Sequence, residues 1–447
     1  MMKITLIATS LLLLSPYGLA MDLVDAYERA KNTDPNWQAN VYQFQADQLN
    51  LGIAKGNLLP TITLSGNITR KHQDLTQMDD GSSNFFNSSD LMSSTSTTKQ
   101  ATITARQPLF RMDAWQGYKQ VKTSVQLSEV TLKLQQQQHL LSVAESYFNV
   151  LRQQSLTLTN AQEEKALLEQ LNMMNAKLRE GLVAKSDVGE ANAQYQNARA
   201  NRIATATQLI LAQEQLVQLT GPYNEKLAVL RDDFQYQKPI PSALEEWQGL
   251  ARSQNLDILQ ARLQQQYAND QRRVEQAAIY PQIDAVASYG YNTQTPKTII
   301  SNDGQFDQIG VELNWTMFNG GKTKRNIDKA RLNVKKSESQ YDAAIRKANT
   351  DVKKSFLQVE TDQATLQARK AAMESSALVS QASQAQYSEG LKNMVDVLLA
   401  QRNAFSTKQE FVNAQYDYVL NVLKLKASIG QLNEAELAQM NAWLVYK

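Results

Sequence analysis

The sequence contains no cysteine, and its 447 residues include only two histidines. The lack of cysteine excludes thiol catalysis, thiolate metal sites and lipid attachment through an N-terminal cysteine. The histidines, His72 and His139, lie far apart in different kinds of segment, and an isolated histidine is usually structural. We therefore expect neither a metal site nor a bound cofactor.

Neither sign of charge dominates, because 46 lysines and arginines nearly balance 44 aspartates and glutamates. Nucleic acid is therefore not an expected partner, since its recognition calls for a basic surface. Beyond residue 20 the sequence also lacks any apolar run of about 18 residues, the length that a membrane-spanning helix needs. If the mature chain enters a membrane, it must do so as a β-barrel.

Catalytic motifs are also missing. The segment Gly320-Gly321-Lys322-Thr323 resembles the end of a phosphate-binding loop, but Thr316 stands where the motif requires an earlier glycine. The adjacent acids Glu163 and Glu164 point to different faces of a helix and form no catalytic pair. No nucleophile elbow or zinc motif is present. The chain is therefore not expected to be an enzyme.

The N-terminus has the features of a secretory signal. Lys3 precedes an apolar run over 4–14, and small residues occupy two positions of Gly18-Leu19-Ala20 that a signal peptidase reads. The mature chain then begins at Met21 or Asp22, and the protein is exported.

Long helical patterns occupy most of the mature chain. Residues 113–180 contain no proline and a single glycine, Gly117, and their apolar positions recur at heptad-like intervals. This pattern predicts about 100 Å of helix, ending at Gly181. A second long helix is predicted over 321–389, ending at Gly390. Shorter helices are predicted at 24–58, 184–220 and 393–429.

Two segments alternate as strands do. Ile62 and Leu64 would lie on one face of the first segment and threonines on the other. We predict hairpins over 61–107 and 283–315, each with strands of about the 9 to 11 residues that span a membrane in a barrel. A polar loop is predicted at 79–97.

The order of these elements in the first half returns in the second, which indicates a tandem duplication. A Pro-rich linker separates the halves. The predicted parts are a signal peptide (1–20), a first repeat (21–222), a linker (223–243), a second repeat (244–430) and a C-terminal segment (431–447).

Four strands per chain cannot close a membrane barrel, for which eight strands is about the smallest number. The barrel must then be shared between chains. Two chains would give eight strands and three would give twelve, and the strand pattern leaves both open.

Several motifs, in this order along the chain, resemble those of the TolC family of outer-membrane efflux channels. The similarity covers essentially the whole mature chain. The motifs are Leu58-Leu59-Pro60, Gln107-Pro108-Leu109-Phe110, Tyr147-Phe148-Asn149-Val150-Leu151, Gly181-Leu182-Val183-Ala184-Lys185-Ser186-Asp187-Val188 and Val395-Asp396-Val397-Leu398.

The resemblance implies an α+β membrane protein. In such a protein the long coiled-coil helices form a periplasmic α-barrel, and three chains share a twelve-stranded β-barrel in outer-membrane lipid. It implies a homotrimeric exit duct for efflux, including antibiotic efflux, or for type I secretion. Such a duct docks with an inner-membrane pump and a periplasmic adaptor protein.

The resemblance also implies a gate at the two helix-tip turns, Gly181 and Gly390. By motif position, Asp187 and Ser186 of the first copy would face Tyr387 and Lys392 of the second. A tyrosine hydroxyl donates well to a carboxylate, and an ammonium can bond a serine oxygen. Lys392 stands where related channels carry arginine, so this contact should be more mobile.

An entrance constriction is implied one turn further. Related channels often carry two aspartates one helical turn apart, whereas this chain has Asp396 followed by Leu399. We expect one ring of three carboxylates in a trimer, with weaker cation selectivity or a narrower apolar constriction.

Two other interpretations stay open at this point. Asp187 and Asp396 could be solvated carboxylates that stabilise helix starts through the helix dipole. The chain could also be a secreted coiled-coil structural or adhesive protein, although such a protein would not need four alternating segments that recur with the helices.

Overall fold

The structure, a computed structural model, describes residues 20–74, 93–231, 234, 236, 238–295 and 303–446. The chain divides into two compact units. The helical unit takes the described residues within Met1–Gln43, Val130–Gln260 and Asp342–Lys447, and the strand unit takes those within Phe44–Glu129 and Ala261–Tyr341. Each unit therefore combines segments from both halves of the sequence.

Nine helices lie within the described ranges: α1 Leu23–Thr33, α2 Pro35–Gly56, α3 Met112–Arg179, α4 Lys185–Thr220, α5 Leu244–Gln254, α6 Leu256–Ala277, α7 Lys322–Ser388, α8 Met394–Ser428 and α9 Glu434–Asn441. The strands there are β1 Thr61–Asp74, β2 Ser93–Phe110, β3 Val229–Leu230, β4 Gln282–Thr295, β5 Gly304–Asn314 and β6 Leu444–Val445. In these described parts of the chain, no helix is both long enough and apolar enough to cross a membrane.

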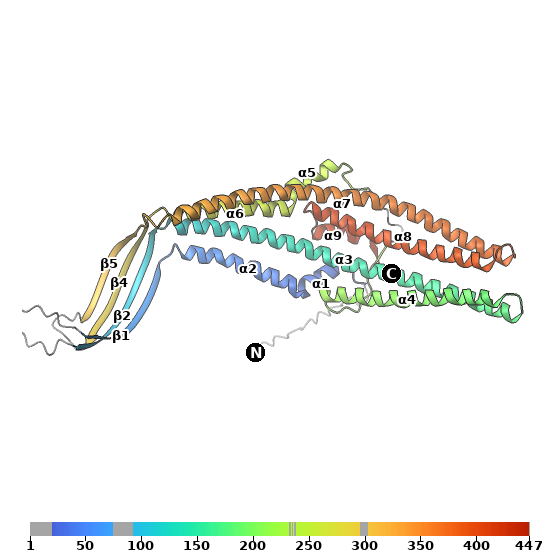
Figure 1. The fold of residues 1–447 in the computed structure, drawn as a ribbon, viewed down its shortest axis with the longest axis horizontal. Coiled ribbons are helices and arrows are strands. Elements are labelled where there is room, and N and C mark those ends of the chain that lie inside the picture. The colour runs from blue at the N-terminus through green and yellow to red at the C-terminus, as the bar shows by residue number, and fades with distance from the viewer. Residues whose placement is uncertain are drawn as a thin grey trace, which may run out of the picture. The chain divides into compact units, whose positions relative to one another are not determined.

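The two long helices begin and end within one residue of the predicted positions. Helix α3 has 68 residues and α7 has 67. After each, a glycine adopts a left-handed conformation, with φ of 76° at Gly181 and 72° at Gly390. The amide of the following residue bonds the carbonyl five positions back, from Leu182 to Lys177 (2.9 Å) and from Leu391 to Gln386 (2.8 Å). Both ends are Schellman motifs, and both turns lie at the same end of the helical unit (Figure 1).

The prediction of one continuous helix over 24–58 is wrong, because the helix breaks at Asp34. Proline at 35 disfavours a helical conformation for the residue before it, and Asp34 is extended, with ψ of 114°. Its Oδ1 accepts a hydrogen bond from the amide of Asn36 at 2.9 Å. In the second half, Asn255 separates α5 from α6; it is also extended, with ψ of 126°, and it donates from Nδ2 to the carbonyl of Ser428 at 2.7 Å.

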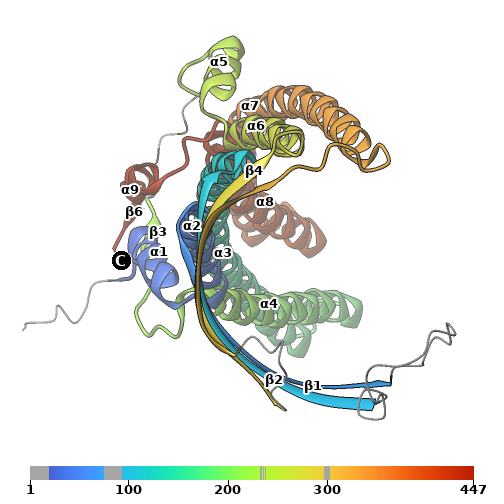
Figure 2. The ribbon, with the colours of Figure 1, turned by 90° about the vertical axis from the view of Figure 1, so that its left-hand side faces the viewer.

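The strand unit holds one antiparallel sheet with the order β1-β2-β4-β5, which is curved (Figure 2). The predicted hairpins are present as β1 with β2 and β4 with β5. The strands are longer than predicted in three cases, with 14 residues in β1, 18 in β2 and 14 in β4, whereas β5 has 11. The predicted loop at 79–97 lies outside the described residues up to residue 92, and strand β2 already begins at Ser93. Strands β1 and β5 form the two edges of the sheet within one chain.

The two faces of this sheet differ in chemistry. One face aligns apolar side chains across the strands, as in Leu64 opposite Ile103 and Ile103 opposite Tyr289. This face is open in the single chain, with Leu64 78% exposed. The other face is polar, and Arg106 pairs there with Asp284 (3.0 Å) and Glu312 (2.7 Å).

The helical unit is held together by a large apolar cluster, here called the main core. Its largest fully buried side chains include Tyr27, Tyr147 and Phe148. The Tyr147 hydroxyl lies within hydrogen-bond distance of two backbone carbonyls, those of Met21 (3.0 Å) and Ala228 (2.8 Å). Strand β3, within the predicted linker, pairs with β6 near the C-terminus, and Leu437 and Met440 of α9 also belong to the main core.

Candidate functional site

The two glycine turns are joined by a second, smaller apolar cluster, here called the tip cluster. It brings together α3, α4, α7 and α8, and so both halves of the chain. Its buried members are Leu167, Met174, Ala191, Ala198, Met394, Val397 and Leu398, and its partly buried members are Leu171, Val183, Val188, Tyr195 and Tyr387.

Asp187 and Ser186 lie in the first turn of α4, beside each other. The Asp187 Oδ2 accepts a hydrogen bond from the amide of Ala184 at 3.3 Å, and the Ser186 hydroxyl donates to Asp187 Oδ1, also at 3.3 Å. The carboxylate therefore satisfies a free amide at the positive end of the helix dipole. Within one chain, both predicted residues form their hydrogen bonds inside the first copy.

Tyr387 of α7 contacts a residue that the sequence motifs do not indicate. Its hydroxyl accepts a hydrogen bond from Lys177 Nζ at 3.0 Å, and the same nitrogen lies 4.3 Å from the centre of the tyrosine ring. Lys177 belongs to the last turn of α3. The predicted facing of Tyr387 and Asp187 is not a hydrogen bond within this chain; the cross-copy partner of Tyr387 is Lys177.

Lys392 likewise bonds inside its own copy. Its ammonium donates to the hydroxyl of Ser383 at 3.0 Å, and Ser383 is buried in α7. Ser186 is therefore not its partner within this chain. A second contact between the copies comes from Gln170 of α3, whose Nε2 lies 2.6 Å from the sulfur of Met394 at the start of α8.

Asp396 and Leu399 both lie on the exposed side of the first turns of α8. Asn393 caps the helix by accepting a hydrogen bond from the Asp396 amide at 2.9 Å. This leaves the Asp396 carboxylate facing solvent, and Leu399 is 55% exposed. Residues three apart share a helix face, so the Asp396 carboxylate and the exposed Leu399 side chain lie next to each other on one face of α8.

The sequence profile of outer membrane efflux proteins matches residues 26–222 and 247–431 of this chain. The chain belongs to the outer membrane efflux protein family. It is 31% identical to the outer membrane protein TolC of Escherichia coli (strain K12), over 98% of this chain and 87% of that protein. It is 26% identical to the alkaline protease secretion protein AprF of Pseudomonas aeruginosa, over 96% of this chain and 88% of that protein.

The fold is that of solved channels of this kind. The CmeC outer membrane channel of Campylobacter jejuni superposes with a TM-score of 0.78 at 15% identity, covering 94% of this chain and 89% of that one. The resemblance to the TolC family, the fold class and the outer-membrane location with a periplasmic extension are thereby confirmed. The protein is an outer-membrane exit duct, which decides against a secreted coiled-coil structural protein.

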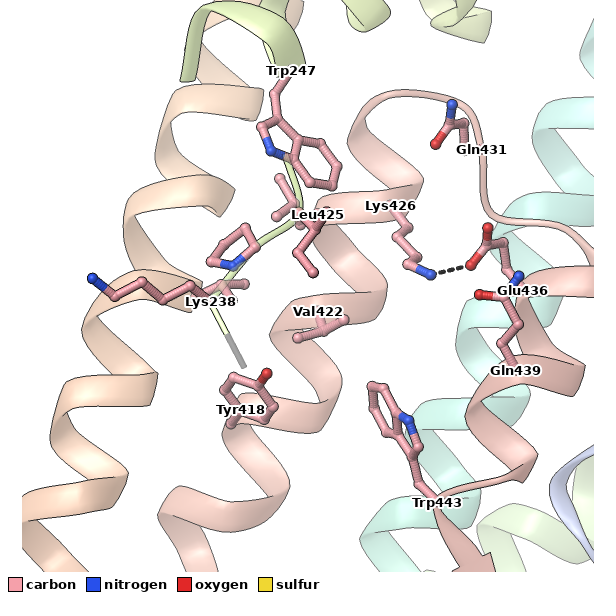
Figure 3. Close-up of a pocket in the computed structure, with 13 residues that line it drawn as sticks. Lys238, Trp247, Tyr418, Val422, Leu425, Lys426, Gln431, Glu436, Gln439 and Trp443 are labelled. Carbon is pink, nitrogen blue, oxygen red and sulfur yellow. Dashed lines mark hydrogen bonds and ion pairs between the residues drawn. The ribbon is translucent and has the colours of Figure 1, made fainter. Parts of the chain in front are cut away.

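The helical unit of this efflux protein also contains a cavity of about 420 Å³ (Figure 3). Trp247, Tyr418 and Trp443 contribute aromatic walls, and the ion pair of Lys426 with Glu436 closes one side. None of the predicted gate or constriction residues lines this cavity, so it is separate from the helix-tip turns.

The His139 side chain packs inside the helical unit, where it has a structural role. Its ring stacks on Trp37 with centroids 5.4 Å apart, and its Nε2 lies 3.2 Å from Asp34 Oδ2, at the break between α1 and α2. Burial lowers the pKa of His139 below its ordinary value of 6.5, although Asp34 acts in the opposite direction. The imidazole is therefore neutral at neutral pH.

Proposed function

We propose that three copies of this chain assemble into one exit duct whose periplasmic entrance is gated at the turns around Gly181 and Gly390. The duct would receive small molecules or proteins from an inner-membrane pump through a periplasmic adaptor protein. Both kinds of cargo remain in the proposal because the relatives include TolC and a protein named for protease secretion.

Assembly is supported by the sheet of the strand unit. Strands β1 and β5 each leave one row of backbone amides and carbonyls unpaired within the chain, and such edges pair readily with another strand. Joining β5 of one copy to β1 of the next would close a barrel, with twelve strands from three copies. The apolar face that carries Leu64 would then contact lipid, and the polar face would line the lumen.

The observation that carries the gate proposal is the contact between Lys177 and Tyr387. It joins the two sequence repeats of one chain at the turns and consists of side chains alone, so it can break without unfolding a helix. The Tyr387 hydroxyl accepts from Lys177, which leaves its own proton free for a carboxylate such as Asp187. Lys392 likewise keeps donors beyond the one used on Ser383 and could reach Ser186.

Asp396 and Leu399 would form the constriction inside this gate. Three exposed Asp396 carboxylates brought around one axis would attract cations and bind multivalent ones. Leu399 would place an apolar ring one turn further on, where it would narrow the pore without adding charge.

The gate is tested by the single-channel conductance of the purified protein in planar bilayers. The double variant Tyr387→Phe with Lys392→Ser should raise the conductance. The two substitutions remove the tyrosine hydroxyl and the lysine ammonium, which form the hydrogen bonds at the turns, and they leave the helices intact. An unchanged conductance would show that these residues do not keep the periplasmic entrance closed. Asp396→Ala should reduce both cation preference and block by multivalent cations, and unaltered values would remove Asp396 from the lumen.

A further inference from the structure

The main core and the tip cluster do not run continuously into each other along α3. Leu156 packs against the main core, and Leu167 belongs to the tip cluster. The buried residues between them are all polar: Thr159, Asn160 and Glu163. Burial raises the pKa of the Glu163 carboxyl above its usual range, and Arg402 of α8 acts in the opposite direction. A polar layer thus separates two apolar clusters.

Asn160 is the centre of this polar layer. Its Nδ2 donates to the hydroxyl of Thr205 in α4 at 3.1 Å, and its Oδ1 accepts from Nε2 of Gln409 in α8 at 2.7 Å. The Asn160 side chain is 4% exposed, and its partners Thr205 and Gln409 are half-buried. One residue of α3 therefore connects α4, from the first half of the chain, with α8, from the second half.

A buried asparagine between helices fixes their register. Apolar surfaces can slide past one another at little cost, whereas a buried amide keeps its hydrogen bonds in one alignment only. Asn160 is satisfied on both sides, so sliding of α8 along α3 would leave the buried amide oxygen of Asn160 without its partner Gln409. The layer therefore resists axial movement at this level more than the apolar packing on either side does.

The contacts between α3 and α8 also differ on the two sides of the layer. Toward the main core, charged pairs join the helices, with Glu145 to Lys424 at 3.0 Å and Arg152 to Asp417 at 2.6 Å. Toward the turns, the corresponding contact is the weak bond from Gln170 to the sulfur of Met394. Sulfur is a poor acceptor, so the polar contacts hold α8 to α3 less firmly there, and the apolar packing of the tip cluster supplies the rest of the contact.

We propose that the polar layer around Asn160 is the fulcrum of the gate. At this point α8 pivots against α3, while the hydrogen bond between Asn160 and Gln409 is kept. The part of α8 toward Met394 moves with the turn at Gly390, and the part toward Ser428 stays with the main core. This inference rests on the proposed gating at the turns. It assigns Asn160, Thr205 and Gln409 a positioning role remote from the entrance.

Reversible cross-linking tests the fulcrum in the full chain, because the sequence has no cysteine and each introduced pair is unique. One variant carries Gln170→Cys with Met394→Cys, on the turn side. The other carries Asn160→Cys with Gln409→Cys, in the layer. A bis-methanethiosulfonate cross-linker joins each pair, and a reductant releases it. Efflux of a fluorescent dye from cells is measured before and after each step.

The turn-side cross-link should abolish efflux and the reductant should restore it. The cross-link in the layer should leave efflux at the level of the same variant without cross-linker. If the layer cross-link also abolishes efflux reversibly, the fulcrum is wrong although the gate stands. If neither cross-link has an effect, the proposed gating at the turns is itself wrong.

A third pair covers the case in which Asn160→Cys does not fold. Gln162 and Lys408 flank the layer, and the Lys408 ammonium donates to Gln162 Oε1 at 2.8 Å on the surface. Cross-linking Gln162→Cys to Lys408→Cys should also spare efflux, because these residues lie beside the pivot. Reversible loss of efflux with this pair would overturn the proposal independently.

Discussion

The main core and the tip cluster both lie where helices of the two halves meet, but they are packed with different side chains. The main core buries aromatic rings such as Phe148 and hydrogen-bonds Tyr147 to the backbone. The tip cluster buries aliphatic side chains and methionines, such as Met174 and Ala198, and its tyrosines are only partly buried. Aromatic rings fix a packing arrangement, whereas methionine adapts to several. The comparison indicates a rigid anchor and a region that can repack.

The same contrast appears in how the two regions are connected. Chain segments far apart in sequence tie the main core together, because Met21, Ala228 and Tyr147 meet there through hydrogen bonds. At the turns, the link between copies consists of side chains such as Lys177 with Tyr387. The contacts at the turns can break one at a time, as gating requires. The contacts of the main core are linked to one another and are lost together, as a rigid region requires.

The largest effect on stability is expected in the main core. Phe148→Ala should destabilise the helical unit by about 3–5 kcal/mol, because it removes a fully buried ring and leaves a cavity. Guanidinium unfolding followed by circular dichroism measures this loss. A change below about 1 kcal/mol, within the range of surface substitutions, would contradict the assignment of this cluster as the anchor.

A cavity in the tip cluster should act locally. Met174→Ala removes a buried side chain and should cost about 2–5 kcal/mol of local packing. We expect faster amide hydrogen exchange around Gly181 and Gly390, while exchange in the main core stays as in the wild type. If exchange in the main core rises equally, the two clusters form one cooperative unit and the contrast between them fails.

The link at the turns should matter little for stability and more for conductance. Lys177→Met keeps the length of the side chain and removes the bond to Tyr387, so unfolding should change by about 1 kcal/mol or less. Single-channel conductance should rise. Lys165→Met, on the exposed surface of the same helix, is the matched control. Equal conductance in the two variants would show that the Lys177 contact does not restrain the gate.

The smallest effect is a dependence of the anchor on pH. Because the pKa of His139 is lowered in the folded state, the unfolded chain binds more protons as pH falls below 6.5. Stability should therefore be fully present above that pH and decline below it. His139→Gln should flatten this decline in thermal unfolding measured between neutral and mildly acidic pH. Parallel curves for variant and wild type would assign the decline to other groups.

Some helix breaks can be predicted from the sequence and others cannot. The break at Asp34 has a local signal, since Pro35 disfavours a helix at the preceding residue. The break at Asn255 has no proline after it and is instead held by the bond from Asn255 to the Ser428 carbonyl. Asn255 also caps α6 locally, because its Oδ1 accepts a hydrogen bond from the Ile258 amide at 3.0 Å, but its partner Ser428 lies far along the chain and no local pattern reveals that contact.

The sequence by itself determined the long helices, their glycine ends, the alternating strands and the family. These features depend on periodicity and on single residues such as Gly181 and Gly390, which act within a few positions of the chain. Only the tertiary structure decided that Tyr387 meets Lys177 and that Asn160 joins α4 to α8. Those partners depend on how helices from the two halves pack side by side, and heptad-like spacing sets which face is buried without choosing the polar side chains that meet there.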